Sequence, residues 1–209
     1  MKSKLHTILF LSAFCFVSAV SLDVMAQDFL EPSDRFMGNN KDGNSQNQYD
    51  NEVVKYLFPQ EWSIGYFASP SLSGQYGIFL IRDNDGPMLV YNRFKSNYSV
   101  SRRGRSKKEE NVKVSSDTVR ISTEEADRLT AIITDAIDKA VKPNGLGRLV
   151  FDGTTYFFML PDKMAKTCSP EKNTNCYNLV EEFENQKKLF GDEHFWSSPK
   201  FVSLSLVSQ

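Results

Sequence analysis

Residues 76–94, with the sequence YGIFLIRDNDGPMLVYNRF, decide the fold more clearly than any other part of the chain. Two runs rich in aromatic and aliphatic residues, 76–82 and 87–94, flank the segment Asp83-Asn84-Asp85-Gly86. Asp, Asn and Gly between two such runs are typical of a tight turn between paired strands. The pattern therefore predicts an antiparallel β-hairpin. A calcium loop is the weaker interpretation of the acidic turn, because the closing Glu of that motif is missing.

Further β-strands are predicted at residues 62–68, 112–121, 148–151 and 154–160. Asp152-Gly153 separates the last two runs and is a dipeptide that two-residue hairpin turns favour. Within 112–121 the valines and Ile121 do not all share one face of a strand, so a turn at 115–117 is the alternative. Short turns between successive strands indicate a largely antiparallel sheet.

The longest predicted helix spans residues 123–141. Ser122 and Glu125 have the spacing of a capping box, in which each side chain bonds a free backbone amide of the first turn. Apolar residues then recur at helical spacing from Ala126 to Ala140. A Pro-Asn-Gly sequence follows and is expected to stop the helix.

A second amphipathic helix is predicted over 178–190, and one or two helical turns are predicted over 52–58. The second helix has an apolar stripe made of Leu179, Val180, Phe183 and Phe190. Gly191 follows it as a C-cap. These elements define an α+β protein, in which a mostly antiparallel sheet is packed by two amphipathic helices in a two-layer sandwich.

Aromatic residues are numerous, with sixteen Phe and eight Tyr. The predicted strands carry six that we assign to the core and to one face of the sheet: Trp62, Tyr66, Phe67, Tyr156, Phe157 and Phe158. A ligand groove lined by these rings is the alternative.

The composition is that of one ordinary globular domain. The chain has 209 residues, a formal net charge of -1 and a mean hydropathy of -0.40. The length excludes a large multidomain enzyme, and the hydropathy argues against a protein with many membrane spans. The charge balance gives no general attraction to nucleic acid, so no nucleic-acid partner is expected.

The N-terminus has the three parts of a secretory signal peptide. Lys2 and Lys4 precede an apolar run over residues 8–20, and Val24-Met25-Ala26 then offers small or aliphatic residues where a signal peptidase cuts. A membrane anchor is the alternative, but the run is short for a span of about 20 residues. We therefore expect cleavage after Ala26, and no transmembrane segment in what remains.

The predicted organisation has three parts: residues 1–26 as the signal peptide, 27–50 as a flexible polar arm, and 51–209 as a single α+β domain. The arm is predicted because Asn, Asp and Gln dominate 27–50 and no apolar period is present. The expected location is the periplasm or the medium.

Cleavage would leave two cysteines, Cys168 and Cys176, in the mature chain. Paired cysteines in an exported protein usually form a disulfide, and the polar segment between these two contains Pro170 and several turn-forming residues. A Cys168–Cys176 disulfide is therefore predicted. Two reduced thiols are the alternative.

The mature chain contains no recognisable catalytic or metal-binding motif, so no catalytic residue, metal ligand or cofactor is assigned. His194 would be its one histidine, which excludes a zinc site built from several His and Cys ligands. Acidic clusters occur at Glu124-Glu125, at Glu181-Glu182 with Glu184, and at Asp192-Glu193. A glycosidase needs two carboxylates across a cleft, whereas these positions favour exposed helix starts and helix faces.

A basic segment is the one candidate for a binding surface. It comprises Arg102, Arg103, Arg105, Lys107 and Lys108, with Tyr98 just before it. Cations beside aromatic rings suit an anionic glycan of the envelope or an acidic protein surface. A solvated loop tip is the alternative, since Glu109-Glu110 follows at once.

Two short motifs for modification also occur. Asp117-Thr118-Val119 fits a pattern for O-glycosylation in some exported bacterial proteins, and Asn97-Tyr98-Ser99 is an N-glycosylation sequon. Whether Asp117-Thr118-Val119 is glycosylated stays open at this stage.

Two stretches together resemble an uncharacterised family of small exported bacterial α+β proteins. They are SPSLSGQYGIFL, residues 69–80, and FDGTTYFFML, residues 151–160, which is followed by a Cys-Ser-Pro turn and a helix. The resemblance covers about 62–190. It implies the architecture and the exported location, and it implies no activity, substrate or catalytic residue.

The function expected from the sequence is that of an exported non-enzymatic protein that binds another macromolecule, as inhibitors and immunity proteins do. Surface shape, rather than a catalytic set, then carries the function. The alternatives are a carboxylate-dependent hydrolase acting on cell-wall or glycan material, and a structural component of the envelope.

Overall fold

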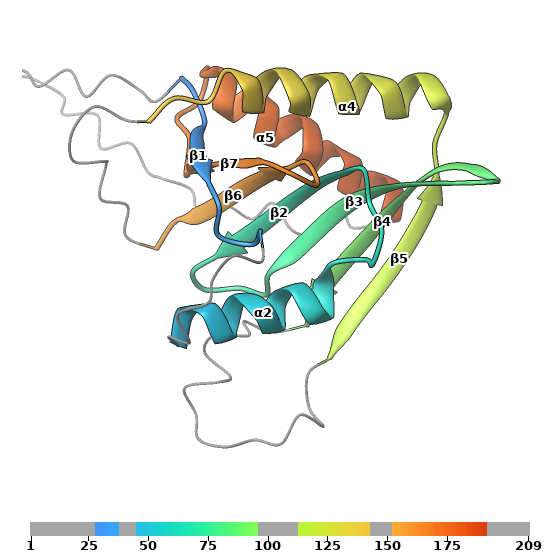
Figure 1. Cartoon of the computed structure of the whole chain (residues 1–209), viewed down its shortest axis with the longest axis horizontal. Helices are drawn as coiled ribbons and strands as arrows, with labels where there is room; N and C mark the ends of the chain where they lie inside the picture. Colours follow the sequence, from blue (N-terminus) through green and yellow to red (C-terminus); the bar gives the residue numbers. More distant parts are fainter. Residues whose placement is uncertain (1–27, 38–44, 96–112, 143–151, 192–209) are drawn as a thin grey trace, which may run out of the picture.

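The computed structural model describes residues 28–37, 45–95, 113–142 and 152–191 (Figure 1). The elements in chain order are β1 (Glu31–Ser33), α2 (Ser45–Leu57), β2 (Ile64–Pro70), β3 (Tyr76–Asp83), β4 (Gly86–Phe94), β5 (Val114–Arg120), α4 (Thr123–Asp138), β6 (Thr154–Met159), β7 (Met164–Cys168), α5 (Asn175–Gln186) and the 3-10 helix η2 (Lys187–Phe190).

A seven-stranded antiparallel sheet forms the centre of the protein, with the strand order β1-β7-β6-β2-β3-β4-β5. The predicted hairpin is confirmed as β3 and β4, which pair from Tyr76↔Arg93 to Asp83↔Gly86. Gly86 has a φ of 106°, a backbone conformation that glycine adopts without strain. The Asp83 side chain accepts a hydrogen bond from the backbone amide of Asp85 at 2.9 Å and closes the turn.

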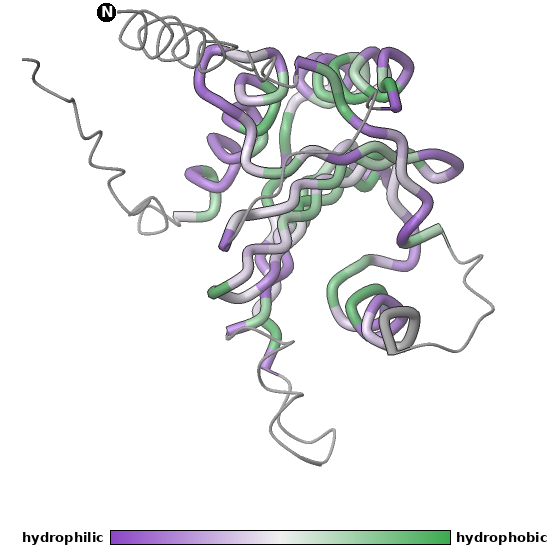
Figure 2. Tube along the Cα trace, turned by 90° about the vertical axis from the view of Figure 1, so that its left-hand side faces the viewer, coloured by the Kyte–Doolittle hydropathy of each residue, from purple (hydrophilic) through white to green (hydrophobic). Residues whose placement is uncertain are grey.

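Helices cover the sheet in the way Figure 1 shows: α4 and α5 lie over one face, and α2 lies against the other. The α+β architecture with two amphipathic helices on an antiparallel sheet is thereby confirmed. The helical turns predicted over 52–58 belong to α2, which begins earlier, at Ser45, and lies on the second face. In the turned view of Figure 2, hydrophobic stretches of the strands run between the helices.

Alternating side chains of the strands build one apolar cluster on each face. The cluster under α4 and α5 contains Tyr66, Phe158 and Tyr156, and the cluster under α2 contains Phe67, Phe157 and Trp62. The six predicted core aromatics therefore divide between the two faces instead of sharing one.

The predicted flexible arm is wrong for the described part of residues 27–50. β1 pairs with β7 at the edge of the sheet, and α2 already begins at Ser45. The Arg35 guanidinium donates to the Asp50 carboxylate through Nε at 3.0 Å and Nη2 at 2.9 Å, which ties the segment after β1 to α2. These long-range partners give order to a stretch whose local sequence has no apolar period.

Two strand predictions also need correction. β5 runs without interruption through 115–117, because Val114 packs on the α2 face while Val119 packs on the α4 face. β6 forms its hairpin with β7, which was not predicted, and the predicted strand 148–151 lies outside the described residues.

The predicted capping box at the start of α4 is found in part: Ser122 caps the helix, while the Glu125 carboxylate accepts hydrogen bonds from Arg128. Ser122 Oγ accepts the backbone amide of Glu125 at 3.1 Å, as a capping residue does. α5 begins earlier than predicted, at Asn175, and Thr174 caps it. Gly191 ends η2 with a φ of 70°, as predicted for a C-cap glycine.

The predicted disulfide is not formed, and both cysteines are free thiols. Cys168 has the same parity along β7 as Met164, so it points to the α2 face of the sheet and is exposed. Cys176 is buried in the cluster under α4 and α5. The two thiols therefore lie on opposite faces of the sheet, which their short spacing in sequence does not reveal.

Candidate functional site

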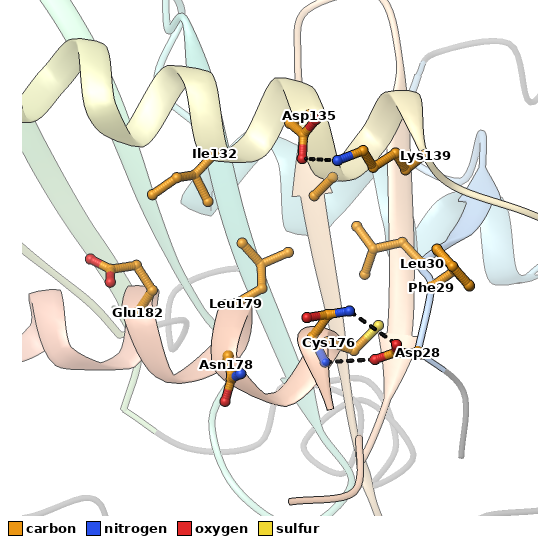
Figure 3. Close-up of a pocket in the computed structure, with 12 residues that line it drawn as sticks. Asp28, Phe29, Leu30, Ile132, Asp135, Lys139, Cys176, Asn178, Leu179 and Glu182 are labelled. Atoms are coloured by element: carbon orange, nitrogen blue, oxygen red, sulfur yellow. Dashed lines mark hydrogen bonds and ion pairs between the residues drawn. The ribbon is translucent and has the colours of Figure 1, made fainter. Parts of the chain in front are cut away.

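A groove of about 400 Å³ lies between α4, α5 and the segment that precedes β1 (Figure 3). Its lining residues are Asp28, Phe29, Leu30, Ile132, Asp135, Ala136, Lys139, Asn175, Cys176, Asn178, Leu179 and Glu182. We call this feature the α4–α5 groove.

The floor of the α4–α5 groove is apolar. On α4 the buried stripe that includes Leu129, Ile133 and Ile137 faces the sheet. Ile132 and Ala136 flank that stripe, are only partly buried, and line the groove; Ile132 is labelled in Figure 3. Leu179 faces them from α5, and Figure 3 shows its side chain pointing toward α4.

One end of the α4–α5 groove is closed by the chain before β1. The Asp28 carboxylate accepts the Asn175 backbone amide at 2.7 Å and the Asn175 side-chain amide at 3.0 Å (Figure 3). A carboxylate at this position satisfies a free donor of the first turn of α5 and complements the helix dipole. The Val141 amide donates to the Leu30 carbonyl at 2.8 Å, so the same segment is also tied to the end of α4.

Apolar surface continues outward from this closed end. Phe29 is 52% exposed and Val141 is 55% exposed. They are two of the four large hydrophobic residues exposed among the described residues, and both belong to the segments joined by the Val141–Leu30 hydrogen bond. Exposed apolar residues beside an apolar groove are a typical feature of interaction sites.

Charged side chains form the rim of the α4–α5 groove. Arg128 Nη2 lies 2.5 Å from Glu182 and 2.7 Å from Glu125, and this bridge connects the two helices. The hydrogen bond from Arg128 lowers the pKa of Glu125, and the two carboxylates raise the pKa of Arg128. On α4, Lys139 Nζ lies 2.8 Å from Asp135 (Figure 3).

Beneath α5 lies a buried charged centre that the sequence analysis missed. The Glu184 carboxylate accepts the hydroxyl groups of Tyr66 and Tyr76, each at 2.5 Å, and the Lys187 ammonium at 2.7 Å. The side chains of Glu184 and Lys187 are only 2% and 3% exposed. Lys187 Nζ also lies 4.3 Å from the centre of the Tyr76 ring, within the range of a cation–π contact.

The prediction that the acidic residues of this helix are solvated is wrong for Glu184. Glu181 is exposed, as predicted, but Glu184 is buried. The sequence contained the signal: Val180, Glu184 and Lys187 follow the i, i+4, i+7 spacing of one helix face, and Val180 belongs to the predicted apolar stripe. An acid and a base on that stripe indicate a buried pair.

The buried centre changes the titration of its tyrosines. Burial, and then the charge of Glu184, raises the pKa of Tyr66 and of Tyr76 well above the usual value of 10. The same two causes raise the pKa of Tyr156 to about 12. Since Tyr66, Tyr76, Glu184 and Lys187 are all buried, we assign the Glu184 centre to stability and not to binding.

The predicted binding residues all lie outside the described residues. They are Tyr98, Arg102, Arg103, Arg105, Lys107 and Lys108. His194, the Asp192-Glu193 pair and the sequon at 97–99 lie outside them too.

The possible O-glycosylation motif lies on β5, the strand at one edge of the sheet. Asp117 and Thr118 are both exposed there, and Val119 is partly buried under α4. The geometry therefore leaves the Thr118 hydroxyl accessible from solvent.

The described residues contain no group of three or more His, Cys, Asp or Glu side chains that could hold a metal ion. None of the helices in this part of the chain combines the length and the apolar composition of a membrane span. No family model, no curated protein and no solved structure matches the chain.

Proposed function

We propose that this protein is an exported, non-enzymatic binding protein that recognises another protein through the α4–α5 groove. The observation that carries the proposal is an open groove of about 400 Å³ with an apolar floor, which continues into the exposed residues Phe29 and Val141. Exposed apolar surface rimmed by polar residues marks sites of protein–protein interaction or ligand binding.

The carboxylates of the groove support binding over hydrolysis. Asp28 caps α5, Asp135 pairs with Lys139, and Glu182 pairs with Arg128. Asp28 and Glu182 hold the walls together, and Asp135 pairs within its own helix. A hydrolase, in contrast, needs one carboxylate to donate a proton and another to act on the substrate. Hydrolysis of cell-wall or glycan material stays the alternative, and a structural role in the envelope is a third candidate.

Export is part of the proposal and rests on residues 1–26. If a signal peptidase removes them, the protein recovered from the envelope or the medium has an intact mass that corresponds to a chain starting at Gln27. A full-length chain that is found only in the cytosol would contradict export. The resemblance to small exported bacterial proteins supports the same location and stays a prediction.

The groove is tested with Ala136→Phe, which places a ring on its floor. The matched control is Ala131→Phe, because Ala131 is exposed on the same helix and does not line the groove. The chain from Gln27 onward is used to capture its partner from the envelope fraction of the exporting cell. We expect wild type and Ala131→Phe to recover the same protein and Ala136→Phe to lose it.

Equal recovery by Ala136→Phe, with its fold intact by circular dichroism, would contradict the proposal. Release of soluble fragments from purified cell-wall material or glycan by the wild type, lost in Ala136→Phe, would favour the hydrolase instead.

A further inference from the structure

We infer that the segment recognised by the α4–α5 groove is a cationic amphipathic helix of the partner protein. This inference rests on the proposed function and specifies the chemistry of the partner. Three features of the described residues carry it: the charge of the helical layer, the helical walls of the groove, and the length of the groove.

The helical layer is acidic although the chain as a whole is nearly neutral. α4 contains five carboxylates and one basic residue, and α5 contains three carboxylates and no basic residue. Lys139 and Lys142 follow α4, and Lys187 and Lys188 follow α5, which leaves eight carboxylates against five basic residues in this layer. Around the groove itself, the carboxylates of Asp28, Asp135, Asp138, Glu181 and Glu182 outnumber the basic residues Arg128, Lys139 and Lys163. The surroundings of the groove therefore carry a negative excess, while the formal charge of the full sequence is only -1.

Acidic side chains stand where a partner would meet them. Asp135 is 64% exposed at the rim, where it pairs with Lys139 of its own helix, and Glu182 is partly exposed on the opposite wall, where it pairs with Arg128. Glu181 is exposed close by on α5, and Asp138, which pairs with Lys163, is exposed on α4. The exposed oxygens of these carboxylates can also accept cations of a partner. Complementary charge at such positions increases the association rate and selects the partner, so Lys and Arg are expected beside the partner's apolar face.

The walls of the groove favour a helix over an extended segment. α4 and α5 use their backbone groups within their own helices, so they offer a partner no row of free amides and carbonyls. An extended peptide would lose the hydration of its own backbone there without replacement. A helix satisfies its backbone internally and presents only side chains, as in other helix-in-groove complexes.

The groove has the length of two helical turns. Its lining residues extend over 132–139 on α4 and 175–182 on α5, about two turns of each helix, or roughly 11 Å. Apolar side chains at i, i+4 and i+7 of a partner helix span a similar length. Ile132, Ala136 and Leu179 are the residues that they would contact.

Three synthetic peptides of about 14 residues, a length at which helices begin to form, test the inference. Two share one leucine stripe at i, i+4, i+7 and i+11, and carry either Lys or Glu at the remaining positions. The third is the Lys peptide with a central proline, which breaks the helix. Binding is measured by fluorescence anisotropy with the chain from Gln27 onward, its Ala136→Phe variant and its Ala131→Phe variant.

We expect the Lys peptide to bind wild type and Ala131→Phe at least about tenfold more tightly than the Glu peptide. The difference should nearly vanish in about 1 M salt, where charges are screened over about 3 Å. The proline peptide and the Ala136→Phe variant should each lose at least about tenfold in affinity.

Equal binding of the Lys and Glu peptides would overturn the cationic partner, and equal binding of the proline peptide would overturn the helical one. If no peptide binds while Ala136→Phe still abolishes partner capture, the inference is wrong and the proposed function stands. If Ala136→Phe changes neither peptide binding nor partner capture, both the inference and the proposed function are wrong.

Discussion

The Glu184 carboxylate holds three buried side chains together beneath α5. It accepts hydrogen bonds from Tyr66 and Tyr76 and pairs with Lys187 inside an aromatic core. Removing one partner of a buried ion pair leaves an uncompensated charge, whereas replacing both by apolar residues of similar volume is often tolerated.

Glu184→Leu is therefore expected to lower the free energy of unfolding by about 3–5 kcal/mol. The double variant Glu184→Leu/Lys187→Met should recover a large part of that loss, since no charge then stays buried. Urea denaturation of both variants measures the difference. A double variant as unstable as the single one would show that the ion pair itself, and not the cost of an orphaned charge, stabilises the fold.

The raised pKa values of the buried tyrosines predict alkaline instability. Tyr66, Tyr76 and Tyr156 stay protonated in the folded protein at a pH where the unfolded chain already releases protons. Their contribution to stability is thus fully present below about pH 10 and is lost as the pH rises through the folded pKa values, because the unfolded state then binds fewer protons.

Urea denaturation between about pH 8 and pH 11 should show that the free energy of unfolding decreases as the pH rises. Tyr76→Phe should make this decrease smaller. Tyr56→Phe is the control, since Tyr56 packs on the opposite face of the sheet. The explanation is wrong if the pH profile of Tyr76→Phe coincides with that of wild type.

Among the secondary-structure elements, those with local signals were predictable from sequence. The β3–β4 hairpin has its turn residues between two apolar runs, and α4 has its cap and its stripe within one stretch. β1 is a short strand at the edge of the sheet, and its partner β7 lies far away in sequence. The order of β1 comes from this pairing and from the Arg35–Asp50 contact that follows it, so no local pattern reveals it. β7 has only five residues and lies between β1 and its hairpin partner β6.

The turn between β7 and α5 gives a prediction about thiol chemistry. Cys168 is exposed on the α2 face, while Cys176 is buried under the other face, where burial raises its pKa to about 11. Since the thiolate is the reactive form, Cys168 should be alkylated quickly in the folded protein and Cys176 only after unfolding.

Mass spectrometry after timed iodoacetamide treatment, without reductant, measures both rates. If neither cysteine is alkylated until a reductant is added, the predicted Cys168–Cys176 disulfide is formed after all. Cys168→Ser serves as the control that identifies the fast site.

At the scale of the whole molecule, the groove could not be predicted from the sequence because it forms where three segments that are distant in the chain meet. Asp28–Leu30, α4 and α5 are brought together by the Asp28–Asn175 and Arg128–Glu182 contacts, and neither contact joins neighbours in the chain. The fold class followed from local patterns, but the place of binding depends on how α4 and α5 lie beside each other on one sheet face. The α4–α5 groove is the central claim about function.

The most direct test is an amide NMR titration of the ¹⁵N-labelled chain with the captured partner, or with the Lys peptide. We predict that the largest shift changes map to 28–30, to 132–139 on α4 and to 175–182 on α5, and that Ala136→Phe abolishes them. Changes confined to β5 or to α2, with the groove amides unmoved, would contradict the account.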